Sequence, residues 1–311
     1  MAIRRTHNTT SKVMKRYIYN VAELNFAVVV PSTVDIDKTL PSMSGFRVEL
    51  ADDVEPIFEA RCVERLTIED DVPSQMLEQN VNDMGQVSIE RKGEGYMVSL
   101  SNVGSEYKHR LYSTAEFRDI ELQICWDDRW AGHSLNSLLR IAFAQAVAHH
   151  VGVSIHGSVV IKDDAAYLFL GKSGTGKSTH SKMWQTLFED CELLNDDNPT
   201  IRIVDGKVNI YGTPWSGKTP CYKNAKCRLQ GVVRLKQAPV NEFYEQSGLE
   251  AFVALLPGCA VLRFDTIIYN KVCDTLFQII GAVNVGQLAC LPDVAAAKLC
   301  YERLKENRIN N

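Results

Sequence analysis

The chain has 311 residues, of which 45% are hydrophobic and 23% are charged, and its net charge is −4. This composition is typical of a soluble globular protein with one large domain or two of ordinary size. It lacks the strongly basic balance of nucleic-acid-binding proteins, so we expect no nucleic-acid partner. No apolar run approaches the roughly 18 residues of a transmembrane helix, so we expect no membrane partner and a cytoplasmic location.

The nine cysteines form no C-x-x-C pair and no Cys/His cluster at zinc spacing, and their number is odd. Several lie inside apolar runs, which predicts a reducing compartment without structural disulfides. Residues 1–15 carry arginines and lysines but no acid. We interpret them as a basic flexible N-terminus, with an organelle-targeting peptide as the alternative.

Residues 16–130 are predicted to form a smaller, mainly antiparallel β-rich module. Short apolar and β-branched runs alternate with turn residues, and Lys92-Gly93-Glu94-Gly95 predicts a hairpin turn. The segments between these runs, including Asp70-Asp71-Val72-Pro73, are expected to be loops. The module shows no chemical motif. The predicted strands are Tyr17–Tyr19, Phe26–Val30, Phe46–Leu50, Gln86–Arg91, Tyr96–Ser101 and Asp119–Trp126.

Residues 131–311 are predicted to form a mixed α/β domain. Its first element is a helix over Ser134–Val151, with Ser134 as the N-cap, Gly152 as the stop, and His149 and His150 suiting the C-terminal end of the helix dipole. Strands and helices then alternate. The predicted strands are Val153–Ile161, Ala165–Leu170, Cys191–Leu194, Thr200–Val204, Lys207–Tyr211, Leu229–Leu235 and Val285–Ala289, and the helices are Lys177–Phe188, Gly248–Leu256, Asp265–Ile280 and Val294–Glu306.

One segment, Gly171 to Ser178, matches G-x-x-x-x-G-K-[ST] at every fixed position. It lies between a predicted buried strand and a predicted helix, where backbone N–H groups and the positive end of the helix can surround phosphate oxygens. The alternative is a glycine-rich surface turn. The predicted nucleotide-binding residues are Gly171, Ser173, Gly174, Thr175, Gly176, Lys177, Ser178 and Thr179.

Phosphoryl transfer also requires charge neutralisation, metal ligands and a base. Lys177 can neutralise the β- and γ-phosphate oxygens, and the Ser178 hydroxyl can ligate Mg²⁺. Asp196 and Asp197 follow the next predicted strand. Adjacent side chains on an extended chain point in opposite directions, so one carboxylate can face the metal and the other the acceptor hydroxyl. The alternative for this pair is a solvated acidic turn.

Three further residues are candidates for the same site. His156 opens the strand before the glycine-rich loop, and either a structural or a catalytic role fits it. Arg263 can approach the γ-phosphate as a fixed cation, or it is a surface arginine. Lys218 ends a loop of turn residues around Trp215 and can contact substrate or nucleotide.

The succession of His156-Gly157, the GKSGTGKST loop and Asn195-Asp196-Asp197 resembles the catalytic domain of HPr kinase/phosphorylase, a fold related to phosphoenolpyruvate carboxykinase. The resemblance covers about residues 153–204. It implies that Asp197 is the base, that Asp196 lies near the metal, and that Lys177, Ser178 and His156 are the loop lysine, the metal-binding serine and the active-site histidine.

The chain also departs from that family's pattern. It has Ser178-Thr179 where the family has Ser-Glu, and it has no counterpart of the family's downstream glutamate or Arg-Pro-Gly-Arg-Asn signature. These departures indicate a divergent branch.

The sequence therefore predicts an ATP- and Mg²⁺-dependent kinase that acts on a hydroxyl of an unidentified peptide, protein or small molecule. A nucleotide-binding regulator that hydrolyses slowly or not at all is the alternative. Carboxykinase chemistry is a weaker third hypothesis. The choice between ATP and GTP, the identity of the acceptor and the oligomeric state stay open. A homo-oligomer is among the oligomeric states that fit the sequence.

Overall fold

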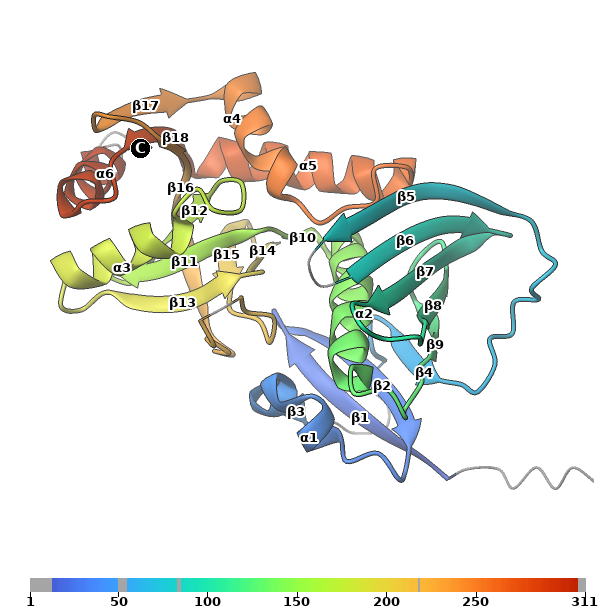
Figure 1. Cartoon of the computed structure of the whole chain (residues 1–311). Helices are drawn as coiled ribbons and strands as arrows, with labels where there is room; N and C mark the ends of the chain where they lie inside the picture. Colours follow the sequence, from blue (N-terminus) through green and yellow to red (C-terminus); the bar gives the residue numbers. More distant parts are fainter. Residues whose placement is uncertain (1–12, 50–54, 83–84, 218, 307–311) are drawn as a thin grey trace, which may run out of the picture.

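The structure is a computed structural model that describes residues 13–49, 55–82, 85–217 and 219–306. It is a mixed α/β structure with two mixed β-sheets that lie side by side (Figure 1). Its helices are α1 (Ile36–Thr39), α2 (Ala131–Ala146), α3 (Lys177–Leu187), α4 (Gly248–Leu255), α5 (Thr266–Ala282) and α6 (Val294–Glu306). Among the described helices, none has both the length and the hydropathy needed to cross a membrane.

The first sheet has nine strands in the order β3-β1-β2-β4-β9-β8-β7-β6-β5. The pairs β2–β4 and β4–β9 are parallel and the other neighbours are antiparallel, so the sheet is mainly antiparallel as predicted. Its strands are β1 (Met14–Val21), β2 (Leu24–Pro31), β3 (Arg47–Val48), β4 (Glu59–Cys62), β5 (Ser74–Asn82), β6 (Gly85–Lys92), β7 (Gly95–Asn102), β8 (His109–Thr114) and β9 (Asp119–Gln123).

Three of these strands lie where the sequence predicts loops. β5 is an edge strand of mostly polar, exposed residues, β8 has a single fully apolar residue at its centre, and β4 is only four residues long. Such segments carry no apolar alternation from which a strand could be recognised. The strand expected over Phe46–Leu50 is shorter, since Phe46 ends a 3₁₀ turn and Leu50 lies outside the described residues.

The second sheet runs in the order β10-β14-β15-β16-β12-β11-β13, and β18 pairs with both β16 and β17. The pairs β12–β16 and β16–β18 are parallel and the rest are antiparallel. Its strands are β10 (Gly152–Ser154), β11 (Gly157–Lys162), β12 (Ala165–Leu170), β13 (Glu192–Asp197), β14 (Thr200–Val204), β15 (Lys207–Tyr211), β16 (Lys226–Gln237), β17 (Glu242–Gln246) and β18 (Asn284–Cys290).

Strand β12 is buried along its whole length because both faces of the second sheet are covered. Leu168 and Leu170 face the main hydrophobic core, which continues into the first sheet. Tyr167 and Phe169 face a smaller core on the other side, where Trp184 of α3 and residues of α6 pack. The glycine-rich loop therefore follows a strand that is fixed on both sides.

Helix α2 contacts both sheets. Phe143 lies with its ring centroid 5.9 Å from that of Phe26 on β2 and 5.2 Å from that of Trp215, which follows the second sheet's β15. The helix also packs on β7 and β8. The division of the chain into residues 16–130 and 131–311 stays a prediction, and α2 is the element that joins the two parts.

The predicted ends of this helix are wrong. It begins at Ala131 after Trp130, and Ser134 lies inside it, where its hydroxyl accepts a hydrogen bond from Asn102 over 2.8 Å. Its C-terminal end continues as a 3₁₀ turn to His150, and Val151 in the left-handed region ends it, with φ 50°. Ser134 does not cap the helix, because its side chain is buried and its hydroxyl is hydrogen-bonded to the first sheet.

The hairpin between β1 and β2 docks on the second sheet. Its turn residues Ala22 and Glu23 have φ of 52° and 61°, as a tight two-residue hairpin requires. The Ala22 carbonyl accepts a hydrogen bond from Arg202 over 2.7 Å, and the Glu23 carboxylate accepts one from the Tyr211 hydroxyl over 2.7 Å. A further bond joins Tyr96 to Asp265, the N-cap of α5, over 2.8 Å.

Candidate active site

The glycine-rich loop connects β12 to α3, as its sequence predicts. Gly174 and Gly176 have φ of 78° and 104°, a backbone conformation that favours glycine. Open space surrounds the position where a Cβ would stand at either residue, so their backbone is accessible to a bound group. Helix α3 begins at Lys177, directly after Gly176, and its positive end is therefore next to the loop.

The other predicted nucleotide-binding residues line the same turn. Gly171 starts it, and the Thr175 hydroxyl donates to the Lys172 carbonyl over 2.7 Å, which closes the loop on itself. Ser173, Ser178 and Thr179 are exposed. The loop borders a cavity of about 530 Å³, to which Arg234 and Lys236 of β16 also contribute.

The Lys177 ammonium is held at the mouth of the loop. It donates hydrogen bonds to the carbonyls of Gly171 over 2.9 Å and of Lys172 over 3.4 Å, and the residue is 9% exposed. Burial lowers the pKa of Lys177, and the charges of Asp197 and Asp196 partly offset that shift.

Asp196 lies beside the first turn of α3. Its carboxylate accepts a hydrogen bond from the Ser178 hydroxyl over 3.0 Å, and the residue is 6% exposed. Mg²⁺ is commonly bound by one or two protein oxygens together with substrate phosphates and water, so this pair fits such an ion. In the part of the chain that the structure describes, no group of three or more His, Cys, Asp or Glu side chains could hold a metal by itself.

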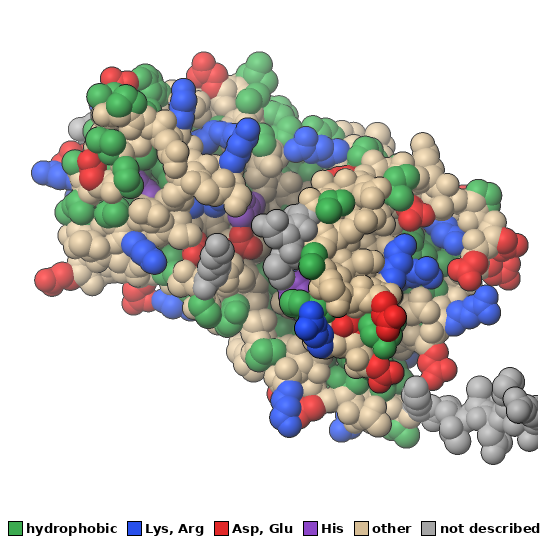
Figure 2. Space-filling view, in the orientation of Figure 1, with side chains coloured by type: hydrophobic (Ala, Val, Ile, Leu, Met, Phe, Trp, Pro, Cys, Tyr) green, Lys and Arg blue, Asp and Glu red, His purple; other side chains and the backbone are tan. Residues whose placement is uncertain are grey.

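Asp197 points to a different partner, His156. The Nδ1 atom of His156 lies 2.9 Å from a carboxylate oxygen of Asp197, and the two side chains are 42% and 33% exposed. Gly157 pairs with Asp197 in the β11–β13 ladder, which brings the two residues together. Figure 2 shows positive, histidine and acidic side chains meeting in the hollow between the two parts of the molecule.

The strand predicted over Val153–Ile161 is wrong in its middle. The chain leaves the sheet after Ser154, Ile155 pairs with Cys259, and the His156 N–H donates to the Gly258 carbonyl over 2.7 Å. This break places His156 directly before the first residue of β11 and not within a continuous strand.

The backbone of Asp197 is strained, with φ of 146°. Buried hydrogen bonds around it hold this conformation. Asn195 accepts from the Asn198 N–H over 3.0 Å and donates to the Thr213 carbonyl over 3.2 Å, and the Gly217 N–H donates to the Asp196 carbonyl over 2.6 Å. Strain of this kind concentrates at functional sites because the surrounding structure must enforce it.

The electrostatic surroundings favour the ionised form of Asp197. Burial by itself raises the pKa of this carboxyl, but the hydrogen bond and charge of His156 and the charges of Arg140 and Lys177 outweigh it, so the pKa is lower than the ordinary 3.8. The carboxylate is therefore unprotonated at neutral pH.

Two residues of the site were not found from the sequence, Arg140 and Asn198. Arg140 donates a hydrogen bond from Nη1 to the Asn198 side chain over 3.3 Å, and Asn198 donates to Asp197 over 2.5 Å. Burial lowers the pKa of Arg140, and the charge of Asp197 opposes that shift. The one signal in the sequence is that no other Arg, Lys, Asp or Glu occurs in α2.

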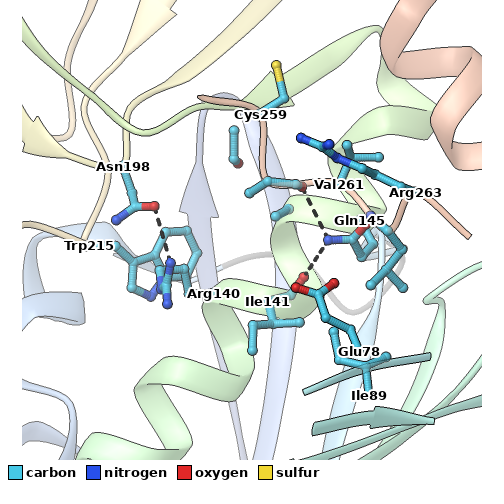
Figure 3. Close-up of a pocket in the computed structure, with 14 residues that line it drawn as sticks. Glu78, Ile89, Arg140, Ile141, Gln145, Asn198, Trp215, Cys259, Val261 and Arg263 are labelled. Carbon is cyan, nitrogen blue, oxygen red and sulfur yellow. Dashed lines mark hydrogen bonds between the residues drawn. The ribbon is translucent and has the colours of Figure 1, made fainter. Parts of the chain in front are cut away.

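Arg263 lies apart from the glycine-rich loop. It lines a second cavity together with Arg140, Asn198 and Trp215 (Figure 3), and among the described residues it forms no hydrogen bond or ion pair. Its role at the γ-phosphate stays a prediction. Trp215 donates to Asn136 of α2 over 3.2 Å, whereas Lys218 lies outside the described residues.

Comparisons with known proteins add little to this geometry. No family model matches the chain, and no curated protein matches it. Among solved structures, it is similar to an Hpr(Ser) kinase/phosphatase from Coxiella burnetii at 12% identity, with a TM-score of 0.30, over 50% of this chain and 91% of that one.

Proposed function

We propose that the chain is an ATP- and Mg²⁺-dependent phosphotransferase that phosphorylates a hydroxyl group. The observation that carries the proposal is that two adjacent carboxylates contact two different side chains beside the glycine-rich loop. Asp196 accepts from Ser178 over 3.0 Å, and Asp197 lies 2.9 Å from His156. The first arrangement suits a metal on the nucleotide phosphates and the second suits a base for the acceptor.

In the proposed reaction, the loop N–H groups and Lys177 hold the β- and γ-phosphates of ATP. Ser178 and Asp196 would hold Mg²⁺, which would supply positive charge beside the phosphate oxygens. Asp197 orients the acceptor hydroxyl and takes its proton, and His156 fixes the Asp197 carboxylate in place.

The acceptor oxygen forms a bond to the γ-phosphorus while the bond from that phosphorus to the β–γ bridging oxygen breaks. The products are ADP and a phosphate monoester. Catalysis of this kind depends chiefly on positioning and charge neutralisation, which a strained, tightly hydrogen-bonded Asp197 supports.

The test is ATP turnover with Mg²⁺, with and without a pool of cell metabolites and peptides, in the wild type and in Asp197→Asn. We expect the pool to raise ADP formation, and the variant to bind ATP normally but to lose about 100- to 10,000-fold in rate, the usual contribution of a general base. Asp205→Asn, on an exposed turn, is the matched control. Tight ATP binding without turnover under any condition would favour a nucleotide-binding regulator.

A further inference from the structure

A cavity of about 490 Å³ lies between the two sheets, next to Asp197. Strands β5 and β6, helix α2 and residues 259–263 form its walls (Figure 3). Its volume is in the range of pockets that hold small organic molecules. Asn198 lines it and donates a hydrogen bond to Asp197, so the cavity adjoins the proposed base.

Arg140 brings to this cavity a positive charge that interacts with the nearby charge of Asp197 but, among the described residues, forms no hydrogen bond to a carboxylate. A guanidinium has five N–H donors, and among the described residues the neutral amide of Asn198 is the one hydrogen-bond partner of Arg140. Burying a guanidinium whose N–H donors are mostly unpaired is costly. An anionic ligand in the cavity would remove that cost and engage the remaining donors.

Two other charged side chains line the cavity. Glu78 accepts a hydrogen bond from Asn80 over 2.5 Å, and within the described residues it forms no ion pair with either arginine. Figure 3 shows Arg140 close to Asn198 and Trp215, and Glu78 and Arg263 toward the opposite side. Arg140 is therefore the cationic side chain on the Asn198 side of the cavity, the side that adjoins Asp197.

The wall that carries Arg263 is fixed to α2 by Gln145. This side chain is 3% exposed, donates to the Ala260 carbonyl over 3.3 Å and accepts from the Leu262 N–H over 2.9 Å. The cavity is thus bounded by hydrogen-bonded backbone, and its lining includes the apolar side chains of Ile89, Ile141 and Val261. A preformed cavity with few polar groups is typical of small-molecule sites.

The position of Asn198 limits the length of the ligand. Its amide contacts Arg140 on one side and Asp197 on the other. A ligand that places an anionic group on Arg140 and a hydroxyl on Asp197 must therefore span only the width of one side-chain amide. The two groups are then a few covalent bonds apart.

We infer that this cavity binds the phosphoryl acceptor and that the acceptor is a small hydroxy acid, whose carboxylate Arg140 binds while its hydroxyl faces Asp197. The inference rests on the proposed kinase function. The acceptor hydroxyl gives its proton to Asp197, and its oxygen bonds to the γ-phosphorus of ATP while the bond from that phosphorus to the β–γ bridging oxygen breaks. The products are ADP and the hydroxy acid phosphorylated on its hydroxyl.

The experiment compares hydroxy acids with neutral counterparts of similar shape. The probes are D-glycerate, L-lactate and 3-hydroxybutyrate against glycerol, propane-1,2-diol and butane-1,3-diol. Phosphoryl transfer from labelled ATP is measured together with binding of each probe by saturation-transfer NMR in the presence of a non-hydrolysable ATP analogue. The variants are Arg140→Gln, Arg140→Lys and the exposed Arg263→Gln, with exposed Arg228→Gln as the control.

We expect at least one acid, and no neutral counterpart, to be bound and phosphorylated. Arg140→Gln should raise the KM for that acid by about 10- to 100-fold, the usual effect of losing a charge-assisted hydrogen-bonded pair, and Arg140→Lys by less. Arg263→Gln, on the opposite side of the cavity, should change it much less than Arg140→Gln does. Arg228→Gln should match the wild type.

Three results would overturn the inference. Equal use of acids and of their neutral counterparts is one. Equal use of an acid by the wild type, Arg140→Gln and Arg140→Lys is another. The third is no response to any acid while Asp197-dependent phosphorylation of a peptide persists, which would leave the kinase function intact. Binding of acids that depends on Arg140 without any transfer would instead contradict the kinase function and keep the binding site.

Discussion

The hydroxyl of Ser178, at the start of α3, donates a hydrogen bond to Asp196 at the end of β13 over 3.0 Å. Strand β11 separates β13 from β12, the strand that leads into the glycine-rich loop. The start of α3 and the end of β13 therefore meet although β12 and β13 are not neighbours in the sheet. They meet because α3 packs across β11 and also contacts β13. This meeting point is the basis of the metal site that we propose.

The metal proposal predicts a higher requirement for Mg²⁺ after substitution of either partner. Ser178→Ala and Asp196→Asn each remove one oxygen ligand or its charge, so the Mg²⁺ concentration at half-maximal turnover should rise by about tenfold or more. Turnover measured against Mg²⁺ at saturating ATP checks this. Thr186→Ala, farther along the same exposed side of the helix, should leave the requirement unchanged.

Lys177→Ala should weaken ATP binding itself. The ammonium lies at the mouth of the loop, and losing its charge-assisted contacts to phosphate should raise the Kd for ATP by about 10- to 100-fold. Equilibrium titration with a fluorescent ATP analogue measures this. The exposed Lys182, on the same helix, provides the control Lys182→Ala. Unchanged affinity in Lys177→Ala would place the phosphates elsewhere.

The pH dependence of turnover should reflect the low pKa of Asp197. Because the charged neighbours outweigh burial and hold this pKa below 3.8, the carboxylate stays ionised as pH falls, and protonation of the base should not reduce kcat/KM until about pH 4 or lower. His156→Ala removes the hydrogen bond and charge that lower the pKa, so the acidic limb should move to higher pH. His156→Gln, which can keep a hydrogen bond, should move it less. Circular dichroism at each pH separates this effect from unfolding.

A separate effect of pH on stability should come from His180. Burial lowers the pKa of this histidine to about 4, and its Nε2 accepts a hydrogen bond from the Trp184 indole over 3.1 Å, which a protonated ring cannot do. The unfolded chain binds a proton near the ordinary value of 6.5. The free energy of unfolding should therefore fall between about pH 6.5 and pH 4, by an amount on the order of 3 kcal/mol.

Urea unfolding of the wild type and of His180→Leu across this pH range tests that expectation. The variant lacks the titrating group, so its free energy of unfolding should depend less steeply on pH in this window. A slope equal to that of the wild type would show that other groups cause the acid sensitivity.

Much of the architecture could be predicted because the signals are local. The glycine-rich loop follows a six-residue buried strand and precedes a helix, and the structure contains β12 and α3 in these positions. The helix expected from Asp265 is present as α5, and Asp265 is its N-cap. Such features depend on backbone conformations that particular residues favour, so the sequence carries them directly.

Other features depended on partners far away in the chain. β5 is polar and became a strand through its pairing with β6, and Ser134 looked like a helix cap but is held by Asn102. The strand predicted through His156 is interrupted because Ile155 pairs with Cys259, about a hundred positions later. No local pattern contains that information.

The sequence by itself determined the glycine-rich loop between a strand and a helix, and it drew attention to Asp196, Asp197 and His156, because these residue types at these spacings are chemically specific. Only the tertiary structure decided which carboxylate meets Ser178 and which meets His156, since that depends on strand register. It also decided that Arg140, on a helix that contacts both sheets, reaches Asn198 beside Asp197. The chemical effect of a buried charge depends on the groups that surround it, and those groups come together only when the chain folds.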